Sequence, residues 1–234
     1  MPGFDYWADY FRKIFTPDID AFAGCLSARV LPTFDNIDEE ASRVEEEEYR
    51  RLSSSFDPES GLDEASLFEW ARDHAVSHYM MMQEVRQGIV NLFGVGLWHR
   101  FEQQLAIYAR RGLPHAFHPA PNPTFKDVQD ALLRMGIDIT VLPSYAKVDE
   151  LRLLANCAKH GDGRSCAQLS ASRPDLFRPP LLKGQDHLPP RAMVIAPLGG
   201  EDFYLTPEAF KEYAEAVKVF WEELGSELER RARA

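Results

Sequence analysis

Residues 63–111, DEASLFEWARDHAVSHYMMMQEVRQGIVNLFGVGLWHRFEQQLAIYARR, decide the fold. Asp63 is a favoured residue for the start of a helix, because its carboxylate can accept hydrogen bonds from the free backbone amides of the first turn. The pattern stays compatible with a helix as far as Arg111, so we predict one long helix, or two collinear helices, at the centre of the molecule. Gly94 and Gly96 each cost about 1 kcal/mol relative to alanine inside a helix, so we expect a kink or a close helix crossing there.

Helix-start signals divide the rest of the chain. Thr16, Thr124, Ser144 and Thr206 each offer a side-chain oxygen that can cap a first turn. Gly161 can take the left-handed conformation that ends a helix. We therefore predict helices over residues 4–15, 16–32, 35–52, 124–135, 144–160 and 206–231. The third of these contains the glutamate run 45–48, which indicates a solvated face.

Two segments are predicted to lie outside helices. The proline-rich residues 112–123 are typical of an exposed connector. Residues 192–205 predict a minor C-terminal β-hairpin, with a turn at Gly199-Gly200.

The sequence thus favours a single domain, 1–234, that is an all-α helical bundle with long central antiparallel helices. The N-terminal helices, 1–111, are joined by the connector to a second part, 124–234.

Composition limits the classes of protein to consider. The chain is 45% hydrophobic and 27% charged, an ordinary globular balance, and carries a formal net charge of −11. No run of about 18 uncharged apolar residues and no signal-peptide pattern occurs, so we expect a cytoplasmic protein that does not enter a membrane. The net negative charge disfavours nonspecific electrostatic binding to the phosphates of nucleic acid. Residues 151–191, however, hold seven basic and three acidic side chains, a local excess of +4.

The three cysteines, Cys25, Cys157 and Cys166, are scattered and odd in number. This usage fits reduced thiols in a cytoplasmic protein better than a disulfide framework or a zinc site. We expect all three to be packing residues.

Residues 151–163, LRLLANCAKHGDG, end a predicted helix and enter a glycine turn. At about 100° per residue, Arg152, Asn156, Lys159 and His160 share the polar face of that helix. A histidine at such a helix end can act as an acid or a base near neutral pH.

This string resembles the signature of HEPN domains, which are helical, are often dimeric and in many cases act as metal-independent ribonucleases. Their pattern is an arginine, usually followed by asparagine, and then a histidine near a helix end. Asn156 and His160 occupy the asparagine and histidine positions, and Gly161-Asp162-Gly163 resembles the polar turn that often follows. The arginine position is Ala155, which departs from the pattern.

The departure matters because cleavage of RNA without a metal requires a group that moves the 2′-hydroxyl proton and a cation that stabilises the phosphorane. The candidate catalytic residues are His160, Asn156 and Arg152, and the candidate binding residues are Lys159, Asp162 and Arg164. The resemblance implies no metal and no cofactor. Without the arginine we expect weak cleavage or none, and we expect Ala155→Arg to raise it.

Two functions from different classes follow. The first is an RNA-binding protein or weak metal-independent endoribonuclease of the defence or toxin–antitoxin type. In it, two subunits would place their Asn156–His160 segments across a shared basic cleft. The second is a non-catalytic protein- or ligand-binding module of the same fold, which fits Ala155 and the net acidity slightly better. An enzyme of another class remains a further alternative.

We predict a homodimer, because the resemblance implies one and because the apolar, Met-rich long helix can supply an interface.

Two histidine pairs invite comparison with metal sites. His74 and His78 have the spacing of two ligands on one helix face, and His99 and Glu102 form a His-x-x-Glu pair. Neither has a third ligand in the sequence pattern, so we expect no metal there. Glu102 is expected to pair with a basic side chain or to cap a polar contact.

Overall fold

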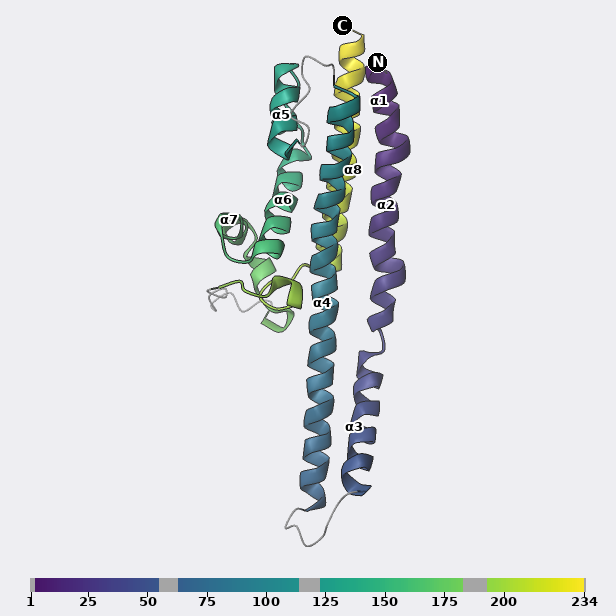
Figure 1. The fold of residues 1–234 in the computed structure, drawn as a ribbon, viewed down its shortest axis with the longest axis vertical. Helices are drawn as coiled ribbons and strands as arrows, with labels where there is room; N and C mark the ends of the chain where they lie inside the picture. Colours follow the sequence, from purple (N-terminus) through teal and green to yellow (C-terminus); the bar gives the residue numbers. More distant parts are fainter. Residues whose placement is uncertain (1–2, 55–62, 114–122, 183–192, 234) are drawn as a thin grey trace.

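The computed structural model describes residues 3–54, 63–113, 123–182 and 193–233. Within these four ranges every regular element is helical and no strand occurs. The central element is α4 (Glu64–Arg111), a single helix of 48 residues and about 70 Å, which spans most of the length of the molecule (Figure 1). The Asp63 carboxylate caps it by accepting a hydrogen bond from the Ser66 amide at 2.9 Å. The predictions of an all-α bundle and of a long central helix are confirmed.

The N-terminal helix lies along the second half of α4. Its parts are α1 (Phe4–Tyr10), the π turn Phe11–Phe15, α2 (Thr16–Cys25), the π turn Leu26–Val30 and a final 3-10 turn, Leu31–Phe34. These parts follow one another without a break, so the predicted helix start at Thr16 is wrong.

Two prolines explain the π turns. Each π turn ends two residues before a proline, Pro17 or Pro32, and the residue before each proline donates its amide to the carbonyl five residues back. A proline ring inside a regular helix collides with the carbonyl four residues earlier. The wider turn makes room for the ring and keeps the helix continuous.

The last helix, α8 (Pro207–Ala232), packs against α1, α2, α4 and α6. It begins at the predicted cap, Thr206, whose hydroxyl accepts a hydrogen bond from the Ala209 amide. Trp221 of α8 is fully buried and donates its indole N–H to the side-chain oxygen of Gln104 at 2.7 Å. One continuous apolar core draws side chains from both halves of the sequence, including Phe11, Phe101, Tyr108, Phe210, Phe220 and Trp221.

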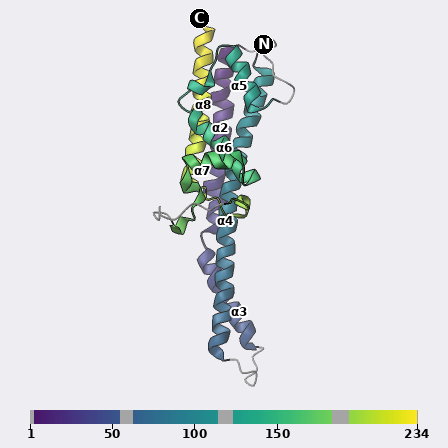
Figure 2. The ribbon, with the colours of Figure 1, turned by 90° about the vertical axis from the view of Figure 1, so that its left-hand side faces the viewer.

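Three shorter helices cover the other side of α4 (Figures 1 and 2). They are α5 (Phe125–Arg134), α6 (Tyr145–His160) and α7 (Arg164–Ser172). Thr124 caps α5 as predicted, and together with Asp127 it forms a capping box. Ser144, in contrast, makes no cap: its hydroxyl donates to the Glu223 carboxylate of α8 at 2.6 Å.

Close approaches explain two glycines of α4. A Cβ atom on Gly94 would lie 2.8 Å from Leu205 and 2.9 Å from Leu154 of α6, and a Cβ atom on Gly96 would lie 2.9 Å from the Phe22 ring of α2. The helix itself runs through both positions without interruption. The close crossing predicted for this segment is therefore confirmed.

The predicted β-hairpin is wrong for residues 193–205, and residue 192 lies outside the described residues. These residues form an irregular loop with a short 3-10 turn, Pro197–Gly199. Side chains hold it: Asn91 of α4 bonds Pro197, Phe203 and Leu205, and Asp202 accepts from the Ile195 amide. Proline cannot donate to a strand ladder, and these side-chain bonds use backbone groups that a ladder would need.

None of the described helices combines the length and the apolar character needed to cross a membrane. The connector, 112–123, and the loop after α3 (Ile37–Ser54) fall mostly outside the described residues.

Candidate functional site

The polar face of α6 opens onto a cleft of about 400 Å³ between α4, α5 and α6. Arg152 and Asn156, two of the residues singled out in the sequence, lie in its wall. The other wall residues come from α4, from the start of α5 with its cap, and from the first half of α6. They are Trp98, Glu102, Thr124, Phe125, Lys126, Gln129, Tyr145 and Asp149.

Aromatic rings line part of this cleft. The Phe125 ring lies 5.4 Å from the Trp98 ring in an edge-to-face arrangement and 6.4 Å from the Tyr145 ring in a stacked one, measured between centroids. Burial raises the pKa of the Tyr145 phenol, and the negative charge of Asp149 adds to the effect. Tyr145 therefore stays neutral at physiological pH, beside aromatic rings of the kind that attract a cation.

The cations of the cleft are already paired. Arg152 donates from Nε to Asp149 at 2.7 Å, and Lys126 lies 2.8 Å from Asp130. The Glu102 carboxylate makes no hydrogen bond or ion pair with any other described residue, and neither does the side-chain amide of Asn156. The predicted pairing of Glu102 with a basic side chain is therefore not seen, and the cleft presents one unpaired carboxylate.

The histidine of the motif lies outside this cleft. His160 and Lys159 are exposed at the C-terminal end of α6, and Arg164 is exposed at the start of α7. His160 lies eight positions after Arg152 on the helix, which is about 12 Å along the axis. The Asp149 carboxylate holds the Arg152 side chain on the side away from His160, so these two residues do not meet around one phosphate.

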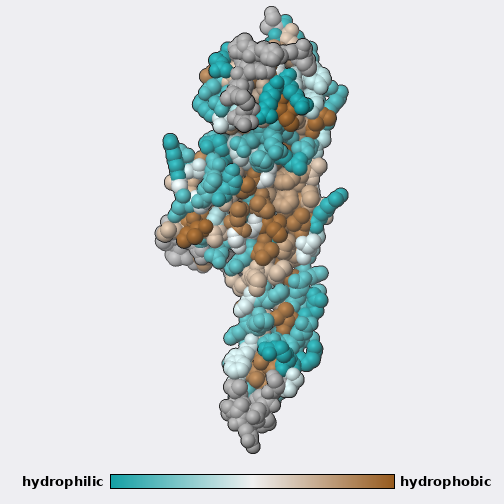
Figure 3. Space-filling view, viewed as in Figure 1, coloured by the Kyte–Doolittle hydropathy of each residue, from teal (hydrophilic) through white to brown (hydrophobic). Residues whose placement is uncertain are grey.

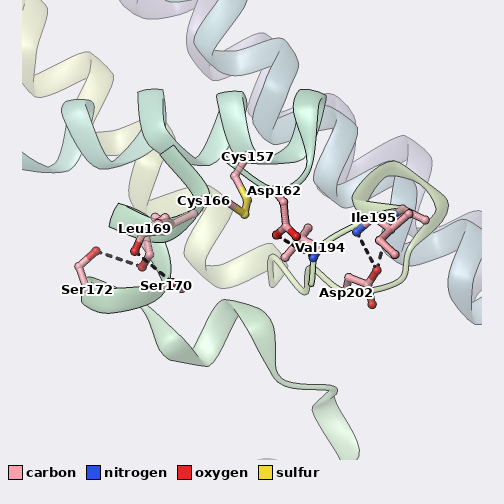
Figure 4. The surroundings of a disulfide bond; sticks show 11 residues. Cys157, Asp162, Cys166, Leu169, Ser170, Ser172, Val194, Ile195 and Asp202 are labelled. Atoms are coloured by element: carbon pink, nitrogen blue, oxygen red, sulfur yellow. Dashed lines mark hydrogen bonds between the residues drawn. A yellow bond between two sulfur atoms is a disulfide. The ribbon is translucent and has the colours of Figure 1, made fainter. Parts of the chain in front are cut away.

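Asp162, a predicted binding residue, is engaged in the loop that follows. Its carboxylate accepts from the Val194 amide at 2.9 Å, and its own amide donates to the Val194 carbonyl at 2.9 Å (Figure 4). Gly161 has φ +66°, and a Cβ atom there would lie 2.6 Å from the same carbonyl. The glycine stop predicted for α6 is confirmed, and Asp162 has a structural role here.

Ala155, which the sequence resemblance aligns with an arginine, is fully buried on the apolar side of α6. An arginine side chain at this point would enter the core beside Leu154 and Leu151 and would not reach the solvent around His160. This burial weighs against the expectation that Ala155→Arg supplies the missing cation, and the effect of that substitution on cleavage stays a prediction.

A disulfide joins Cys157 of α6 to Cys166 of α7, with their Cα atoms 4.7 Å apart (Figure 4). The prediction of reduced thiols is wrong for these two residues, whereas both are buried as predicted. The glycine turn at 161–163 reverses the chain and brings position 166 back beside 157. The cysteine count therefore gives no argument for a reducing compartment. Cys25 is the free cysteine.

Most residues of the cleft have no local signal in the sequence. Trp98 and Glu102 are one helical turn apart, but Phe125, Gln129 and Tyr145 come from other elements. A sequence pattern detects residues at a fixed spacing on one element, and here the packing of three helices brings them together. One weak signal was present: Glu102 is a charge close to the uncharged stretch 87–98.

Among the residues that the structure describes, no group of three or more His, Cys, Asp and Glu side chains could hold a metal ion. His99 is exposed and lies 3.1 Å from the Gln103 amide nitrogen, while His78 lies 3.9 Å from Glu40 of α3.

Comparison of the chain with protein-family models, with curated proteins and with solved structures finds no match in any of the three.

Proposed function

We propose that the chain is a non-catalytic binding module, a degenerate relative of HEPN domains, and that its ligand is an organic cation bound in the cleft between α4, α5 and α6. The unpaired Glu102 carboxylate beside aromatic rings carries this proposal. A carboxylate that a ligand can reach recognises an ammonium or guanidinium group, and the rings add cation–π attraction.

Electrostatics favours a cation over RNA at this site. Arg152 and Lys126 are each neutralised by a neighbouring carboxylate, so little positive charge is left for a phosphate. The separation of Arg152 from His160 and the burial of Ala155 also weigh against the ribonuclease. RNA binding by the exposed group of Lys159, His160 and Arg164 is the rival function.

Two matched ligands test the proposal: N-acetyl-arginine amide, and N-acetyl-citrulline amide, which has nearly the same shape and no charge. Calorimetry and the NMR signal of the Trp98 indole N–H report binding in the cleft. We expect the arginine compound to bind at least about tenfold more tightly, and Glu102→Gln to remove about tenfold of its affinity. Glu222→Gln, an exposed carboxylate of α8 outside the cleft, is the matched control and should change nothing.

The rival function is measured with a labelled single-stranded uridine oligonucleotide in EDTA. If the protein binds or cleaves it, and Lys159→Ala or His160→Ala removes that activity, the RNA function is correct and the proposal fails. Equal binding of the arginine and citrulline compounds, or no binding of either, also contradicts it.

A further inference from the structure

The first half of α4 and all of α3 form a two-helix arm that extends beyond the other helices (Figures 1 and 2). α4 turns Leu67, Ala71 and Ala75 toward α3 and buries them. On α3, whose residues are all described, Ile37 alone is buried. The arm is therefore a thin structure, and its outer sides are covered by no other described element.

The side of α4 that faces away from α3 carries large apolar side chains. We define the arm face as Trp70, Asp73, Val76, Ser77, Met80 and Met81, which lie within about 140° of arc at 100° per residue. Its four apolar members are 49–55% exposed. The other three tryptophans of the chain are all at most 3% exposed. In the view of Figure 3 the arm is mostly hydrophilic, with hydrophobic side chains set among the hydrophilic ones.

Such a face is typical of an interaction site. Monomeric proteins rarely expose a row of large apolar side chains, because water contact with apolar surface is unfavourable. Methionine side chains are flexible and polarisable, and surfaces rich in them bind amphipathic helices of varied sequence.

Charge identifies the kind of helix. α3 and residues 64–87 of α4 hold eleven acidic and five basic side chains, a net charge of −6 with histidines neutral. Asp73 lies within the arm face, and Glu69 and Glu84 lie in the same arc of α4. A second copy would bring an equal negative charge against this surface, whereas a basic helix would complement it.

We propose that the arm face binds a basic amphipathic helix of another protein, with the apolar side of that helix on Trp70, Val76, Met80 and Met81. The acidic side chains around the face pair with its lysines and arginines. This site is separate from the cleft of the proposed function and does not depend on it.

The test uses three synthetic peptides of about 18 residues, or five helical turns. One is an amphipathic lysine–leucine helix, the second has the same composition with the amphipathic pattern scrambled, and the third is an amphipathic glutamate–leucine helix. Trp70 reports binding directly, because its fluorescence shifts to shorter wavelength when its exposed ring leaves water. Labelled peptides give affinities by anisotropy.

We expect the basic amphipathic peptide to bind, with an affinity that falls as salt is raised, and the acidic peptide not to bind. The double variant Met80→Gln, Met81→Gln keeps two long unbranched side chains and should weaken binding at least about tenfold. Leu133→Gln on α5, 54% exposed and far from the arm face, is the matched control and should bind like the wild type.

Three results would overturn the inference. The first is no binding of the basic amphipathic peptide at about 100 µM. The second is equal binding of the scrambled peptide, or no effect of the double variant, because charge alone would then account for binding. The third is a wild-type dimer in sedimentation that the double variant converts to monomer, because the occupant would then be a second copy.

Discussion

At the residue scale, the burial of Ala155 predicts a large effect of substitution on stability. We predict that Ala155→Arg lowers the free energy of unfolding by at least about 3 kcal/mol, because a large side chain is forced into a packed core and its charge is buried without a partner. For a chain of this size the melting temperature should fall by roughly 6–12 °C, measured by calorimetry. Ala146→Arg, on the exposed side of the same helix, should change stability by less than about 1 kcal/mol. An arginine variant at 155 as stable as the wild type would show that the position is not in the core.

At the scale of elements, Glu150 links three helical segments. Its carboxylate accepts from Tyr213 of α8 at 2.5 Å, from Arg173 after α7 at 2.7 Å and from Lys147 of α6 at 3.0 Å. Burial alone would raise the pKa of Glu150, but these three hydrogen bonds outweigh it and leave the pKa lowered. The ionised carboxylate therefore stabilises the way α6 and α8 pack.

The lowered pKa of Glu150 predicts a pH dependence. A carboxyl group of this kind contributes stability above its ordinary pKa of 4.5, and the contribution is lost as the pH falls through the lower folded pKa. Glu150→Gln should therefore cost about 1–3 kcal/mol near pH 7 and progressively less below pH 4.5, measured by urea unfolding. Glu212→Gln, the 64% exposed partner of the same Lys147, should cost little at any pH. A cost for Glu150→Gln that stays constant with pH would contradict the ionic role.

At the scale of the whole molecule, the two-helix arm buries less apolar surface than the body, by which we mean the rest of the helical bundle. The body holds the continuous aromatic core, whereas α3 contributes Ile37 and carries the adjacent acids Glu45–Glu48, which repel one another. We predict that amides of α3 and of residues 64–80 exchange with deuterium at least about tenfold faster than those of α8, because local opening of the arm exposes little apolar surface. Exchange followed by mass spectrometry measures this. Equal protection of α3 and α8 would show that the arm unfolds only with the body.

The predicted homodimer also belongs to this scale and stays a prediction. Figure 3 shows a hydrophobic area over the middle of α4 beside α2, above the arm. Leu92 and Val85 of α4 are 54% and 44% exposed. A dimer formed there would leave the arm face open to its helix.

The sequence by itself determined the helical class and most helix ends. Those features depend on local chemistry: the capping side chains of Asp63, Thr124 and Thr206, and the glycine with positive φ at 161, act within one turn of the chain. The helix start that local rules predicted at Thr16 is wrong. There the N-terminal helix packs along α8 and α4 and continues past Pro17, and a π turn makes room for the proline ring.

Only the tertiary structure decided what surrounds the motif. Whether Ala155 lies in the core, whether Glu102 finds a partner, whether Cys166 meets Cys157 and whether residues 193–205 pair as strands all depend on elements that are distant in sequence. Asn91 shows the reason most directly. Nothing within its own helix predicts that its amide reaches more than 100 residues ahead to Pro197, Phe203 and Leu205, because that contact exists only after α4, α6 and α8 have packed.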